Sequence, residues 1–245
     1  MRSTKPQITD EPIIAPLFYI LAATSFLCVL LISLRETQVL STNFKFLIWN
    51  LFLAWLPLVV SMAALLWARW TKGSLRGVGL LISGVAWILL FPNAPYLTTD
   101  LIHLILIHGY RGFDPEGLLL WYDLVLFFLF MWCGLLLGYL SMHHYHKLVI
   151  QHFSVPTGWL FVFISSYLSG FGVYLGRVVR LNSWDILSPL LLLEEVVEAI
   201  HKPAVIFSIL FGTLIVIVYV SLYVISGGFR TKRVTRPIAS ELTNL

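Results

Sequence analysis

The sequence predicts an all-α integral membrane protein, built as a bundle of about six transmembrane helices. Hydrophobic residues make up 59% of the chain and charged residues only 11%, whereas soluble domains carry about 25% charged residues. The mean hydropathy of +0.89 points the same way. A soluble fold of this length has too little interior to bury so much apolar surface, so we expect the lipid bilayer to surround most of the chain.

Apolar runs predict the order of the spans. Six runs are long enough, or nearly so, to cross ~30 Å of hydrocarbon. The predicted spans are residues 15–34, 46–67, 75–91, 118–142, 157–181 and 203–225. We expect one transmembrane domain over residues 15–226, between a disordered cytoplasmic tail (1–14) and a basic cytoplasmic tail (227–245).

The third span is predicted to break at Pro92 and Pro95. The two prolines remove backbone donors and disfavour helix at the residues before them. A broken helix at membrane depth is tolerated only where protein or water forms hydrogen bonds with the freed backbone groups, so this break is typical of a functional site. After it we expect a short re-entrant or interfacial helix, from Asp100 to about His108.

An amphipathic helix is predicted just before the last span, opened by Ser188 and Pro189. Its apolar positions are Leu190, Leu193, Val197 and Ile200, and its acidic positions are Glu194, Glu195 and Glu198. We expect this helix to lie in the membrane interface rather than to span the bilayer.

Basic residues predict the orientation of the chain. Ten of the 16 lysines and arginines fall on the side of the two termini, and the acids show the opposite bias. An excess of lysine and arginine in short flanking segments marks the cytoplasmic side of a membrane. We therefore expect both termini to be cytoplasmic and the other end of the bundle to face outward.

Polar residues from five separate segments are predicted to gather in the outer half of the bundle. They are Asn50, Asn93, Asp100, His103, Asp123, Arg177, Arg180 and Asp185. A charge at the centre of a membrane helix costs about 2.5–3.5 kcal/mol, so such groups are expected to converge and neutralise one another. Nothing comparable is expected to be buried in the inner half, which predicts a single polar pocket on the extracytoplasmic side.

Asp100, His103 and Asp123 are the candidate catalytic residues. Asp100 and His103 lie three positions apart, on one face of a helix. Together with Asp123 they offer the donor atoms of a three-ligand site for a divalent metal such as zinc, which would supply a nucleophile for hydrolysis. Because an Asp-x-x-His pair also arises by chance, the metal is a hypothesis.

Two arginines suggest recognition of an anion. The candidate substrate-binding residues are Asn93, Arg177, Arg180 and Asp185. Arg177 and Arg180, three positions apart, suit a phosphate or carboxylate group. The alternative is structural, with the arginines paired to Asp123 and Asp100 so that the third, fourth and fifth spans are tied together.

Three further features are expected to carry no chemistry. The tract of His143, His144 and His146 follows the fourth span and is expected to be solvated at the cytoplasmic interface rather than to bind a metal. Cys28 and Cys133 lie in apolar runs and are expected to be small apolar fillers without a disulfide framework. Attraction to anionic lipid explains the basic C-terminal segment, so we expect no nucleic-acid partner.

A resemblance to a known family is carried by the run Phe91-Pro92-Asn93-Ala94-Pro95-Tyr96, followed by Thr99-Asp100, His103-Leu104 and Trp121-Tyr122-Asp123. Over most of the region from the second to the sixth span, the chain resembles the bacterial membrane-protein family catalogued as domain of unknown function 1361. No activity is assigned to that family. The resemblance therefore implies a multi-pass protein of the bacterial inner (plasma) membrane and adds no catalytic roles.

Three functions stay open at this point. The first is binding or hydrolysis of an amphiphile with an anionic head group, such as an anionic lipid or a lipid-linked small molecule, at the outer leaflet. The second is a small-solute transporter that uses the broken third helix. The third is a structural or assembly protein whose polar cluster only ties the helices together. We favour the first of these.

Overall fold

The computed structural model describes residues 14–38, 44–106, 117–180 and 195–227. Its long helices are α1 (Ile14–Gln38), α2 (Lys45–Trp70), α3 (Gly73–Leu90), α7 (Leu118–His152), α8 (Val155–Tyr174) and α10 (Lys202–Ile225). Its short elements are α4 (Asn93–Tyr96), the 3-10 helix η1 (Leu97–Leu101), α5 (Ile102–Leu106) and the π-helical turn η2 (Leu175–Val179). None of the described residues lies in a β-strand.

Six segments of the described chain are long and apolar enough to cross a bilayer, so the predicted all-helical membrane fold is confirmed. Each overlaps one of the spans expected from the sequence. Of the predicted tails, residues 1–13 and 228–245 lie outside the described part of the chain. Of the predicted amphipathic helix, residues 195–198 are helical and most of the remainder falls outside that part.

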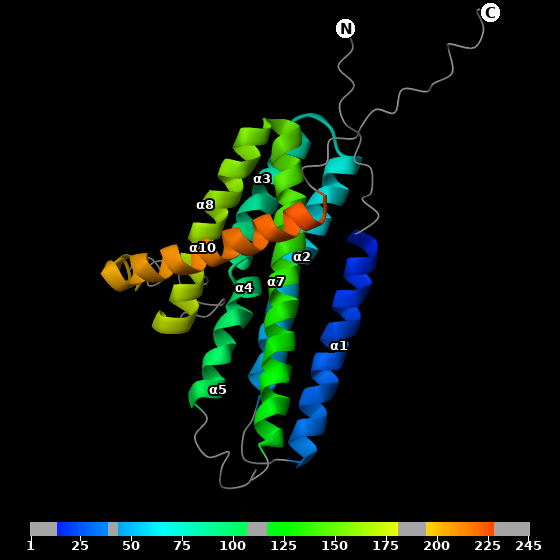
Figure 1. Ribbon diagram of the computed structural model, residues 1–245. Helices are drawn as coiled ribbons and strands as arrows, with labels where there is room; N and C mark the ends of the chain where they lie inside the picture. Colours follow the sequence, from blue (N-terminus) through cyan, green and yellow to red (C-terminus); the bar gives the residue numbers. More distant parts are fainter. Residues whose placement is uncertain (1–13, 39–43, 107–116, 181–194, 228–245) are drawn as a thin grey trace, which may run out of the picture.

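Helix α7 is the centre of the bundle (Figure 1). It packs against α1, α2, α4, η1, α8 and α10, and more than half of its most apolar stretch is buried inside the protein. The sequence analysis ended this span at Met142, whereas the helix continues to His152. No proline or glycine occurs between Gly138 and Pro156, so nothing in the sequence ends the helix earlier. At 1.5 Å per residue the whole of α7 is about 52 Å long, which exceeds the hydrocarbon thickness.

The two ends of the bundle are distinguished by the helices that turn there. At the lower end in Figure 1, α1 ends while α2 and α7 begin; at the upper end, α2 and α7 end while α3 begins. Helix α1 lies at the edge of the bundle, where it packs mainly against α7 and touches α2 only sparsely.

Helix α10 crosses α8 and α7 steeply instead of running along them (Figure 1). Glycines on both helices allow the backbones to approach closely at the crossing. A Cβ atom on Gly170 would lie 2.5 Å from the carbonyl oxygen of Ser208, and one on Gly212 would lie 2.4 Å from the ring of Tyr167. A larger side chain at either glycine would push α10 away from α8.

Candidate functional site

The break predicted in the third span is present, but the backbone keeps helical dihedral angles through it. Phe91 has φ −55° and ψ −37°, and Pro92 has φ −56° and ψ −25°. The Asn93 side chain donates a hydrogen bond to the carbonyl oxygen of Leu90 at 3.0 Å, while the amide of Ala94 donates to Phe91. Asn93 therefore satisfies the Leu90 carbonyl, whose usual helical donor, the Ala94 amide, bonds to Phe91 instead.

Elements α4, η1 and α5 continue the direction of α3 beyond this break (Figure 1). The short helix expected after the break is thus α5, and it belongs to the same span, residues 73–105. Because its course is continuous with α3, the described part of the segment, up to Leu106, does not turn back as a re-entrant helix would; residues 107 and 108 of the predicted helix lie outside the described residues.

Glycines hold the break tightly against its neighbours. A Cβ atom on Gly134 of α7 would lie 2.4 Å from the carbonyl oxygen of Ala94, and one on Gly172 of α8 would lie 2.5 Å from the Pro92 ring. Real Cβ atoms do not approach other atoms so closely, so both positions require glycine unless the backbone moves. Helices α7 and α8 therefore pack directly against the break.

Asp100 is the centre of the polar cluster that follows the break. Its carboxylate is only 1% exposed, and it accepts hydrogen bonds from Arg177 and, at 3.0 Å, from the side-chain amide of Asn50. Arg177 also donates through Nε to the Thr99 hydroxyl at 2.8 Å, and its guanidinium lies 4.4 Å from the centre of the Tyr96 ring. These contacts join the third span to α2 and η2, and the predicted pairing of Asp100 with an arginine is present.

Of the predicted substrate-binding residues that the structure describes, Arg177 is the one that contacts Asp100. Arg177 itself lies in the π-helical turn that ends α8, with 20% of its side chain exposed. Arg180 ends this turn in the left-handed conformation, with φ 68°, and its side chain is exposed. Asp185 lies outside the described residues.

Asp123 forms a second, separate ion pair. Its two carboxylate oxygens accept hydrogen bonds from Nε and Nη2 of Arg35 at 2.5 and 2.7 Å. Asp123 is 0% exposed and Arg35 3%, and the guanidinium also lies 4.0 Å from the centre of the Phe44 ring. The pair ties α1 to α7, and the Tyr122 hydroxyl reinforces this contact by donating to the carbonyl oxygen of Leu31 at 2.6 Å.

The partner of Asp123 therefore differs from the one that the sequence analysis considered. The first span was predicted to end at residue 34, which leaves Arg35 outside it, whereas α1 continues to Gln38 and places Arg35 in its last turn. In the structure Asp123 lies five residues after the start of α7 and Arg35 three residues before the end of α1, so these neighbouring antiparallel helices bring the two side chains to a similar depth.

The three candidate metal ligands do not form a metal site. Within the part of the chain that the structure describes, no three histidine, cysteine or acidic side chains are grouped closely enough to hold an ion. Asp100 and Asp123 each face a different arginine. The Nδ1 atom of His103 is hydrogen-bonded to the backbone oxygen of Asp100 at 3.0 Å, and its ring packs on Phe46. The expectation of an Asp100–His103–Asp123 triad was wrong because arginine pairing competes for both carboxylates.

The histidines predicted to be solvated at an interface are buried within α7. His144 Nδ1 lies 2.9 Å from the Ser61 hydroxyl on α2, and His146 Nδ1 lies 2.7 Å from the Tyr219 hydroxyl on α10. His143 is also buried. The prediction failed because α7 continues past Met142 and α2, α8 and α10 cover it. Buried polar groups thus lie toward both ends of the bundle, and not in one half alone.

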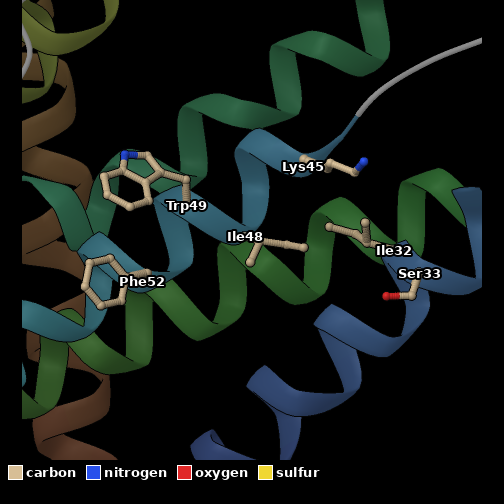
Figure 2. A pocket seen from close by; sticks show the side chains of 6 residues that line it. All are labelled: Ile32, Ser33, Lys45, Ile48, Trp49 and Phe52. Atoms are coloured by element: carbon tan, nitrogen blue, oxygen red, sulfur yellow. The ribbon is translucent and has the colours of Figure 1, made fainter.

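A groove runs between α1 and α2 (Figure 2), near the end of the bundle at which α1 ends and α2 begins. It has a volume of about 370 Å³ and is lined by Ile32, Ser33, Lys45, Ile48, Trp49 and Phe52. The four residues from α2 recur at the spacing that places them on one helix face. Figure 2 shows Lys45 where α2 begins and Phe52 farther along the helix. The groove thus combines apolar walls with a cation near one end.

Comparison with known proteins supports the resemblance seen in the sequence. The family model described as Protein of unknown function (DUF1361) matches residues 49–218. No curated protein and no solved structure matches the chain. The matched region begins within α2 and ends within α10, so it contains the break and both buried aspartates. Because the match covers more than half of the sequence, the chain belongs to the DUF1361 family of proteins of unknown function.

Proposed function

We propose that this membrane protein binds an amphiphile with an anionic head group in the groove between α1 and α2. The observation that carries the proposal is the distribution of polarity along the groove. Ile48 and Phe52 offer apolar contacts to a hydrocarbon chain, and Lys45 offers a positive charge to the head group. From Lys45 to Phe52, α2 rises about 10 Å, so this face of the helix can contact the part of an acyl chain next to the head group.

The position of the groove across the membrane agrees with this kind of ligand. Lys45 is the first residue of α2 and is exposed, and Trp49 is exposed one turn farther along. Lysine and tryptophan at the end of a membrane helix lie at the level of the lipid head groups. A bound amphiphile would therefore keep its head at the membrane surface and its chain in the hydrocarbon.

The buried ion pairs support a structural role within the same protein. Asp123 uses both oxygens on Arg35, while Asp100 uses one on Arg177 and the other on Asn50, and both carboxylates are withdrawn from solvent. Carboxylates held in this way suit the joining of helices better than acid–base catalysis, which requires contact with a substrate. We therefore infer that they stabilise the bundle end in which the groove lies.

We propose the bacterial inner membrane as the location, with both termini in the cytoplasm. Arg69, Lys72, Arg76 and Lys147 support this orientation, since they flank the helix ends at the upper end of the bundle. The groove then opens at the extracytoplasmic side, because Lys45 lies at the opposite end of α2.

The test compares an anionic with a zwitterionic lipid. The full chain is purified in detergent, and its melting temperature is measured during titration with short-chain phosphatidylglycerol or with phosphatidylcholine of the same chain length. We expect phosphatidylglycerol to bind more tightly. Replacing Lys45→Gln should weaken this binding by about fivefold, because one lysine near an anionic lipid contributes about 1 kcal/mol.

Lys202→Gln is the matched control, since Lys202 is also exposed and is also the first residue of a helix, α10. This variant should keep the preference for phosphatidylglycerol. Equal affinity for the two lipids in the unaltered protein would refute the proposal. An equal loss in the Lys45 and Lys202 variants would show that the attraction comes from net charge and not from the groove.

A further inference from the structure

One end of the groove between α1 and α2 carries a hydrogen-bond acceptor as well as a cation. Ser33 lies near the end of α1, Lys45 is the first residue of α2, and both side chains line the groove. Figure 2 shows them toward the same end of the groove, with Phe52 toward the other. A head group placed beside Lys45 would therefore also lie near the Ser33 hydroxyl.

The Ser33 hydroxyl faces a ligand as an acceptor. Its single proton is donated to the carbonyl oxygen of Val29, at 3.0 Å within α1. The oxygen keeps its lone pairs, and none of the residues that the structure describes donates a hydrogen bond to it. The side chain is exposed, and the groove around it is otherwise mainly apolar. An acceptor in apolar surroundings favours a ligand that brings a donor to it.

The cations near Ser33 limit the chemistry of that donor. The charge of Arg35 is balanced by the carboxylate of Asp123, which leaves Lys45 as the cation that the groove offers to an anion. An ammonium donor on the ligand would be repelled by Lys45, since like charges in a medium of low polarity repel strongly. A hydroxyl donates a hydrogen bond without carrying a charge, so it suits both side chains.

We infer that the groove selects an anionic head group that also carries a free hydroxyl, such as a phosphodiester of glycerol or of a sugar. This inference rests on the proposed function, and it adds the chemical class of the head group. The anion lies beside Lys45, and the hydroxyl donates to Oγ of Ser33. Ser33 is therefore a specificity-determining residue, because a head group without a hydroxyl leaves its oxygen without that donor.

The test compares four lipids with the same short acyl chains: phosphatidylglycerol, phosphatidylmethanol, phosphatidylserine and phosphatidylcholine. Phosphatidylglycerol and phosphatidylmethanol carry the same negative charge, but only the first has hydroxyls in its head group. The melting temperature of the purified full chain in detergent is followed during each titration. We expect phosphatidylglycerol to bind about threefold to tenfold more tightly than phosphatidylmethanol, the equivalent of one hydrogen bond. Phosphatidylmethanol should in turn bind more tightly than phosphatidylcholine.

A serine substitution tests the acceptor. Ser33→Ala should bind phosphatidylglycerol and phosphatidylmethanol equally, and it should fold normally because the hydroxyl of this exposed residue bonds only within its own helix. Thr24→Val is the matched control. The Thr24 hydroxyl donates in the same way to the Ile20 carbonyl of α1, at 2.8 Å, but Thr24 does not line the groove. This variant should keep the preference for phosphatidylglycerol.

Failure of the inference and failure of the proposed function give different results. If phosphatidylmethanol binds no more tightly than phosphatidylcholine, the proposed function itself is refuted. If phosphatidylglycerol and phosphatidylmethanol bind equally and both exceed phosphatidylcholine, only the selection of a hydroxyl is refuted. Tighter binding of phosphatidylserine than of phosphatidylglycerol would overturn the choice of a neutral donor. A preference that persists in the Ser33→Ala variant would overturn the role of Ser33.

Discussion

Replacing Asp123→Asn is expected to destabilise the protein strongly, because it removes the carboxylate that accepts two hydrogen bonds from the buried guanidinium of Arg35. Both side chains of the pair are almost completely buried, and two hydrogen bonds at 2.5 and 2.7 Å join them. Asparagine has nearly the same size and shape as aspartate. The substitution therefore removes the negative charge and replaces one acceptor by a donor that faces the guanidinium.

The expected loss can be worked out from this geometry. Removing one partner of a buried ion pair costs about 3–5 kcal/mol. For a chain of this size each kcal/mol corresponds to a change of about 2–4 °C, so the melting temperature should fall by about 6–20 °C. The assay is thermal unfolding of the purified protein in detergent, at one fixed scan rate. Glu198→Gln, at an exposed carboxylate, should change stability by less than about 0.5 kcal/mol.

A double variant distinguishes the cost of removing one charge of the pair from the cost of removing both charges. With Arg35→Met and Asp123→Leu together, neither charge of the pair stays buried, and much of the stability should return. The reasoning fails if Asp123→Asn melts within about 2 °C of the unaltered protein, which would correspond to 1 kcal/mol or less. It also fails if the double variant is no more stable than either single variant.

Two further substitutions test the packing around the break and the buried histidines. Gly134→Ala should lower the free energy of unfolding by about 1–3 kcal/mol, because its Cβ atom would meet the Ala94 oxygen. Gly77→Ala, with open space around it, should raise this free energy by about 0.5–1 kcal/mol. Chemical denaturation measures both changes, and the same sign for both would contradict the contacts. Tyr219→Phe should cost about 1–3 kcal/mol because it deprives the buried Nδ1 of His146 of its partner, and an unchanged thermal midpoint would contradict this reading.

Local sequence patterns were sufficient for the spans and for the position of the break. Apolar composition and run length predict membrane helices because the bilayer leaves few other ways to satisfy the backbone. Pro92 and Pro95 interrupt the third span whatever surrounds them, since proline lacks the amide proton that a helix requires. The pairing of Asp100 with an arginine was also within reach, because a buried charge must find an opposite one.

Local sequence patterns could not identify the partner of each buried polar group. That Asp123 pairs with Arg35 depends on how far α1 extends and on its packing against α7, and neither is written in the residues around Asp123. The same holds for His146. Its sequence position predicts an interfacial residue, but α10 packs against α7 and places the Tyr219 hydroxyl within hydrogen-bond distance of it.

The sequence by itself determined that this chain is a helical membrane protein with a broken third span and buried charges that need partners. The tertiary structure alone decided which charges meet and that the candidate metal ligands stay apart. The physical reason is that solvent preference and backbone chemistry act on each residue locally. Pairing depends on helix length, rotation and crossing, which only the packed bundle defines.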